Sequence, residues 1–115
     1  MTKVILIHPF ELRPEVNAEE FEEFFLTEMA AYTRALPGWK QHLLKCFRGE
    51  REGKYTALLE VESREAYERY FPPSGSPAPE DAQVVETYAA TYERLRSFVV
   101  DLPNPRASDY IILGE

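Results

Sequence analysis

The order of apolar and polar residues along the chain predicts four strands. Residues 4–7 are consecutive aliphatic residues, which is typical of a strand that is apolar on both faces. Residues 39–48 and 55–61 alternate with a period of two, and the polar, glycine-bounded segment 49–53 between them has the length of a hairpin connection. A last run of apolar residues predicts a strand over residues 110–113.

A long helix is predicted between the first two strands, over about residues 18–35. Asn17 stands at its N-cap position, Glu20 follows three residues later, and apolar residues then recur at threes and fours. Pro37 and Gly38 end the helix. Its apolar stripe consists of Phe21, Phe25, Met29, Tyr32 and Leu36.

Two further helices are predicted after the third strand. Ser63 caps a short helix that ends before Pro72, and residues 72–79 form a loop rich in proline, glycine and serine. A longer helix begins at Pro79, since proline suits the first helical position, and Pro105 follows its end. Its apolar stripe consists of Val85, Tyr88, Tyr92, Leu95 and Val99.

This order of elements is typical of the ferredoxin-like βαββαβ arrangement in the α+β class. It predicts one domain over residues 1–115, with loop 72–79 inside it. The domain has a four-stranded antiparallel sheet with both long helices on one face. The first and third strands are central, and the second strand, which carries lysine and arginine, lies at an edge.

The face of the sheet away from the helices needs a cover of its own. An antiparallel sheet with one face in water alternates apolar and polar residues, but residues 4–7 and 110–113 are apolar on both sides. Burying about 800 Å² of apolar surface per partner stabilises association by about 20 kcal/mol before entropic costs. We expect a homodimer whose sheets pack face to face with a cavity between them. The alternative is a monomer in which residues 101–115 fold over the sheet.

Net charge and the length of the apolar runs argue against nucleic acids and membranes as partners. The 115 residues carry 13 Lys and Arg against 20 Asp and Glu, and a net charge of −7 disfavours nucleic-acid binding because it repels phosphates. The apolar runs fall far short of the about 20 residues of a membrane-spanning helix, and the N-terminus lacks a signal-peptide core. We therefore expect a cytoplasmic protein with no membrane partner. One cysteine, Cys46, excludes an internal disulfide.

Four short motifs follow one another over about residues 3–72: IHPFEL at 7–12, a phenylalanine-rich helix, LPGW at 36–39 and EVESREAY at 60–67. In this order they resemble the antibiotic-biosynthesis-monooxygenase-like family of the dimeric α+β barrel superfamily. The resemblance implies a dimeric barrel that acts on polycyclic aromatic compounds, often without metal or flavin, or that degrades heme. It also implies an Asn, a Trp and a Tyr or His at positions where this chain has His8, Val61 and Tyr67.

His8 and Tyr67 are the candidate catalytic residues. His8 follows the apolar run 4–7 on the same side as Val4 and Leu6, where an imidazole can move a proton or bind a ligand atom. The candidate substrate-binding residues are Trp39, Val61, Tyr55 and Tyr110.

These observations lead to two hypotheses of different classes. In the first, the barrel binds a hydrophobic, aromatic small molecule and is similar to cofactor-independent monooxygenases. No cofactor is predicted, and heme is disfavoured because Val61 stands where the family has Trp. In the alternative, the protein is a non-catalytic stress-response or interaction scaffold whose barrel is filled by its own side chains. An open cavity of a few hundred Å³ reached by His8 would favour the first.

Overall fold

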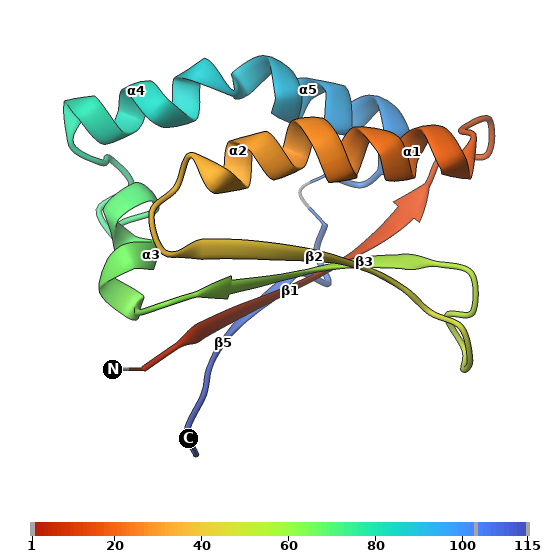
Figure 1. The fold of residues 1–115 in the computed structure, drawn as a ribbon, viewed down its shortest axis with the longest axis horizontal. Coiled ribbons are helices and arrows are strands. Elements are labelled where there is room, and N and C mark those ends of the chain that lie inside the picture. Colours follow the sequence, from red (N-terminus) through yellow and green to blue (C-terminus); the bar gives the residue numbers. More distant parts are fainter. Residues whose placement is uncertain (1, 103, 115) are drawn as a thin grey trace.

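The computed structural model describes residues 2–102 and 104–114, which form an antiparallel sheet with helices over one face (Figure 1). The strand order is β2-β3-β1, and two short strands, β4 and β5, also pair with β1. The predicted α+β ferredoxin-like sheet, with the first and third strands central, is confirmed. The strands are β1 (Val4–Leu12), β2 (Trp39–Lys45), β3 (Tyr55–Val61), β4 (Val99–Val100) and β5 (Ser108–Ile111).

One continuous helical segment connects β1 to β2. It consists of α1 (Ala18–Phe24), the π-helix η1 (Phe25–Met29) and α2 (Ala30–Arg34). The Asn17 side chain caps it as predicted, because its oxygen accepts hydrogen bonds from the N–H groups of Glu19 and Glu20 at 2.8 and 3.1 Å. The π-helical turn in the middle has no counterpart in the sequence pattern.

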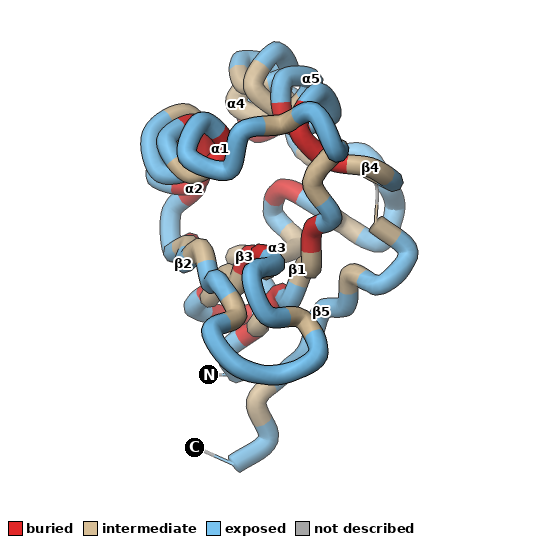
Figure 2. Tube along the Cα trace, turned by 90° about the vertical axis from the view of Figure 1, so that its right-hand side faces the viewer, coloured by how far each residue is buried: buried red, intermediate tan, exposed pale blue. Residues whose placement is uncertain are grey.

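The remaining helices are α3 (Arg64–Tyr70), α4 (Pro79–Thr87) and α5 (Ala89–Phe98). Ser63 caps α3 as predicted and accepts a hydrogen bond from the N–H of Ala66 at 3.1 Å. Figures 1 and 2 show α1, α2, α4 and α5 in one layer over the sheet, with α3 at one end. Within the described part of the chain, no helix is both long and apolar enough to cross a membrane.

The last predicted helix is divided in the structure. Tyr88 (φ −102°, ψ 14°) separates α4 from α5, and Val99 lies in β4 instead of on the helix. Val99 follows Leu95 by four residues, which fits a position on the same helix face, so apolar spacing cannot show that the helix ends before Val99 and a strand begins there. Val99 is buried and pairs with Leu12, which adds a two-residue strand to the four that were predicted.

Four strand ends also differ from the prediction. β1 continues beyond residue 7 to Leu12, and β2 ends at Lys45 instead of residue 48. β5 begins at Ser108 instead of residue 110 and ends at Ile111 instead of residue 113. β1 can include Pro9 although this residue lies opposite Thr56 on β3. Its carbonyl accepts from Asn104 and so points away from β3, toward the side where neither β4 nor β5 pairs with it, and no ladder bond needs its missing N–H.

Two hydrophobic clusters join the helices to the sheet. The first surrounds Phe21, whose side chain is fully buried, and the second surrounds Val61, which is buried on β3. The first cluster comprises Phe10, Phe21, Phe24, Phe25, Tyr55, Ala57, Leu95, Phe98 and Val99. The second comprises Val4, Leu6, Leu36, Trp39, Val61 and Tyr70.

The opposite face of the sheet carries exposed apolar side chains. Ile7, Leu44 and Tyr110 on this face are 38%, 43% and 52% exposed, and no described helix lies over them (Figures 1 and 2). The described residues after α5 do not fold over this face, because β4 and β5 extend the sheet beside β1. The cover that the monomer alternative requires is therefore not supplied by β4 or β5.

Candidate functional site

A cavity of about 760 Å³ lies between the helical layer and the sheet. Its lining takes residues from both hydrophobic clusters, including Phe10 and Leu95 from the first and Leu6 and Trp39 from the second. Ala57, near the middle of β3, also lines it and contributes only a methyl group. The sequence pattern placed a cavity between two packed sheets, but this one lies between the helices and the sheet of a single chain.

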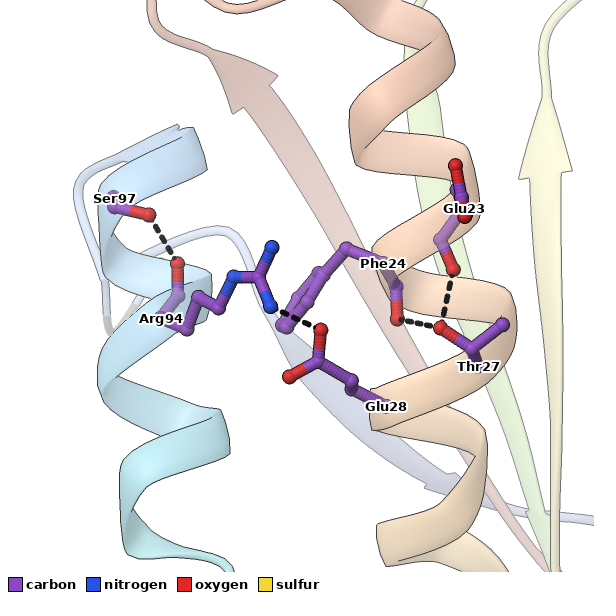
Figure 3. Close-up of polar contacts among 6 residues, drawn as sticks. All are labelled: Glu23, Phe24, Thr27, Glu28, Arg94 and Ser97. Carbon is purple, nitrogen blue, oxygen red and sulfur yellow. Dashed lines mark hydrogen bonds and ion pairs between the residues drawn. The ribbon is translucent and has the colours of Figure 1, made fainter.

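The helices above the cavity are joined by a contact between α5 and the π-helical turn. Arg94 forms an ion pair with Glu28, and its guanidinium lies 5.4 Å from the ring centroid of Phe24 and 6.0 Å from that of Phe98 (Figure 3). In the same turn, the Thr27 hydroxyl donates to the Glu23 carbonyl at 2.7 Å. Figure 3 shows these side chains between the two helices and along the first one.

A polar group at the edge of the cavity joins three elements. The Asp109 carboxylate on β5 lies 3.0 Å from Nε2 of His8 on β1 and accepts a hydrogen bond from the Tyr67 hydroxyl on α3 at 2.8 Å. Asp109 pairs with Leu6 in the strand register, and side chains directly opposite each other share a face. His8, Tyr67 and Asp109 all line the cavity.

The hydrogen bonds fix which atoms can act on a ligand. An ionised carboxylate only accepts, so Nε2 of His8 must carry the proton in its contact with Asp109. In the neutral imidazole this leaves Nδ1 as an acceptor. Burial, and then the hydrogen bond to Asp109, raises the pKa of Tyr67 to about 12, so its hydroxyl stays a donor at neutral pH.

Trp39 lines the same end of the cavity. Its ring is stacked on that of Tyr67, with centroids 5.9 Å apart and planes at 14°, and Phe71 lies 5.8 Å away at a steeper angle. Its Nε1 atom is buried and has no hydrogen-bond partner among the described residues. The structure thus brings together His8, Tyr67 and Trp39, three of the residues that the sequence pattern selected.

The other three selected residues do not line the cavity. Val61 is fully buried in the second cluster. Tyr55 is buried in the first cluster, where its hydroxyl donates to Glu22, and burial together with that carboxylate raises its pKa to about 12. Tyr110 pairs with Ile5, so it lies on the outer face of the sheet.

The sequence pattern missed a second polar group, which lies below the π-helical turn. Gln41 on β2 donates from Nε2 to the Phe25 carbonyl at 3.1 Å and accepts from the Thr33 hydroxyl at 2.8 Å. Nε2 has a second N–H that this bond does not use. A signal existed, since the two-residue alternation put Gln41 on the face that carries Trp39 and Leu43.

Asn104 and Asp109, also missed, come from the segment after α5. The Asn104 amide donates to the carbonyl of Pro9, which holds the loop before β5 against β1. No cluster of His, Cys, Asp and Glu that could hold a metal ion occurs in the residues that the structure describes.

Comparison with known proteins identifies the fold. No protein-family profile and no curated protein matches the chain. Among solved structures, SnoaB, a cofactor-independent oxygenase from Streptomyces nogalater, is 14% identical, with a TM-score of 0.61 over 100% of this chain and 95% of that one. A dabb family protein with a ferredoxin-like fold from Mesorhizobium loti is 15% identical, with a TM-score of 0.59 over 100% and 99%. A dimeric ferredoxin-like protein of unknown function from Thermobifida fusca is 9% identical, with a TM-score of 0.56 over 96% and 90%.

The chain has the ferredoxin-like fold that these solved structures share. The similarity inferred from the motifs in residues 3–72 is thus confirmed at the level of fold. The cavity, His8 and Asp109 all belong to the single chain that the structure describes.

Proposed function

We propose that this protein binds a hydrophobic, aromatic small molecule in the cavity between its helices and its sheet. The observation that carries the proposal is the cavity of about 760 Å³, whose largely apolar and aromatic wall meets the polar group His8–Asp109–Tyr67. Ligand sites are typically concave and apolar, with a few convergent polar groups. An open cavity of this size favours binding over the scaffold alternative, which needs a filled interior.

We assign His8 the role of acid or base in this site. A hydroxyl of the ligand would lose its proton to Nδ1 of His8, which leaves an oxyanion on the ligand and an imidazolium on the protein. Asp109 is 3.0 Å from Nε2 and would stabilise that imidazolium. Tyr67 keeps the Asp109 carboxylate oriented and supplies a neutral hydroxyl.

A monooxygenase-like reaction of the bound molecule is the finer form of this proposal. Its support is the fold shared with SnoaB, described as a cofactor-independent oxygenase. Trp39 and Gln41 supply N–H groups in or beside the wall, and an oxygen atom on the ligand would satisfy such a donor.

The experiment is a thermal-shift and binding screen with aromatic polyketides, quinones and heme. A ligand at about 100 times its Kd stabilises the folded state by about 2.7 kcal/mol, a shift that is easily measured. We expect His8→Ala to weaken binding of any aromatic compound that raises the Tm. His42→Ala is the matched control, because His42 lies on the outer face and pairs with Glu60. Equal binding by His8→Ala and wild type would refute the role of His8.

We further propose that the protein is a homodimer joined through the outer face of the sheet. The support is the exposed apolar surface at Ile7, Leu44 and Tyr110, together with structural neighbours described as dimeric. Wild type should sediment at twice the chain mass of 13.3 kDa. Ile7→Glu should sediment at the mass of one chain, because dimerisation would bury its charge at the interface. Its circular dichroism spectrum should stay that of wild type, which shows that the variant is folded. Leu26→Glu, on the helical side, should remain a dimer.

A further inference from the structure

The described wall of the cavity carries acidic side chains and lacks lysine and arginine. Three of its residues, Glu86, Glu93 and Asp109, are acidic, and no Lys or Arg occurs among the described residues that line it. The whole chain adds a net charge of −7 around it. An anionic ligand in this cavity would therefore meet no fixed positive charge and several negative ones.

One of these three acidic side chains has a cationic partner. Arg96 lies 3.4 Å from Glu93, donates to the Leu102 carbonyl at 3.0 Å and sits over the ring of Tyr92. In residues 2–102 and 104–114, Glu86 has no ion pair. The Asp109 oxygens contact the neutral hydroxyl of Tyr67 and the His8 ring. Glu86 thus contributes a negative charge with no partner at the cavity.

Aromatic rings surround the same space. Tyr88, between α4 and α5, and Tyr92 on α5 follow Glu86 along the chain and line the cavity. The Tyr88 ring is stacked on that of Tyr32, with centroids 5.0 Å apart and planes at 13°. The faces of aromatic rings attract cations, and carboxylates next to such rings add a direct ionic attraction. This is the chemistry of a site for an organic cation.

We propose that the cavity selects aromatic ligands that carry a basic amine over uncharged and anionic compounds of the same shape. The ammonium group lies at the carboxylate of Glu86, and the apolar body lies among the aromatic and aliphatic side chains of the wall. This inference rests on the proposed function, since it names the class of ligand that the same cavity takes. It adds a charge requirement that neither the fold nor the motifs carry.

The test uses three fluorescent anthracenes that differ in one substituent: aminomethylanthracene, anthracenemethanol and anthracenecarboxylate. Each is titrated into the full-length protein at neutral pH and low salt. We expect the amine to bind at least about threefold more tightly than the alcohol, and the carboxylate at least about threefold more weakly, since exposed charge pairs are worth a factor of this order. Added salt should reduce both differences.

The variant Glu86→Gln identifies the source of the selectivity. It should lose most of the preference for the amine over the alcohol. Glu23→Gln is the matched control, because Glu23 is exposed on α1 and does not line the cavity. Two results would overturn the charge selectivity and leave the proposed function standing. In one, anthracenecarboxylate binds as tightly as anthracenemethanol. In the other, the preference for aminomethylanthracene survives Glu86→Gln. Failure of all three anthracenes to bind overturns the proposed function as well.

Discussion

Phe21 is the residue whose removal tests the packing of the helices on the sheet most directly. Its side chain is fully buried, and its ring centroid lies 5.1–5.9 Å from those of four other aromatic rings. The four neighbours come from the first helical segment, the sheet and α5, and they are Phe10, Phe25, Tyr55 and Phe98. Phe21→Ala therefore opens a hole at a junction of three elements.

The expected loss is large compared with the total stability. Removal of a buried Phe side chain costs about 3–5 kcal/mol, because transfer free energy and the remaining hole both contribute. A chain of this length is stable by about 6–17 kcal/mol. With a Tm change of about 4 °C per kcal/mol, Phe21→Ala should melt about 12–20 °C below wild type.

The assay is urea denaturation followed by circular dichroism, with Phe47→Ala as the control. Phe47 is 88% exposed, so the same chemical change there should alter the free energy of unfolding by no more than about 0.5 kcal/mol. If Phe21→Ala loses less than about 1 kcal/mol, or if both variants lose the same amount, the packing described around Phe21 is wrong.

Three further predictions concern the polar contacts. Burial is the largest cause of the raised pKa of Tyr67, about 12, and the hydrogen bond to Asp109 is the second. Asp109→Asn removes the second cause, so Tyr67 should ionise at lower pH in a tyrosinate absorbance titration. An unchanged titration would contradict the contact. Since the pKa of a free tyrosine is 10.0, the stability linked to Tyr67 is complete below pH 10 and is lost as the pH rises through about 12, and Asp109→Asn should lower the upper limit of this window. Gln41→Leu and Thr33→Val should be coupled by about 0.5–3 kcal/mol in a double-mutant cycle, whereas additive losses would show that the two side chains act separately. Arg94→Met should cost about 1 kcal/mol, and strong salt dependence of this loss would show that the Glu28 pair outweighs the ring contacts.

Local sequence patterns were sufficient for much of the fold. Asn17 and Ser63 cap helices where their spacing to later residues indicated, because a cap depends only on residues within one turn. The two-residue alternation put Gln41 and Trp39 on one face of their strand, and the same rule put His8 on the side of Leu6; in the structure all four residues line the cavity. Three of the six predicted site residues, His8, Tyr67 and Trp39, therefore meet at one cavity.

The partner of His8 was beyond the reach of local patterns. His8 and Asp109 are separated by 101 positions, and a strand predicted from residue 110 left Asp109 outside the sheet. Pairing of Ser108–Ile111 with β1 brought Asp109 opposite Leu6. A shift of one residue would turn its carboxylate to the other face.

The sequence by itself determined most of the helices and the four longer strands, and which side chains on them share a face, since both depend on neighbours a few positions apart. Tertiary structure alone decided the cavity within one chain, the π-helical turn over Gln41, and the strand at Val99. Each of these depends on contacts between segments far apart in the sequence, and the energy of those contacts is set by register and packing. Periodicity along a single segment carries no information about either.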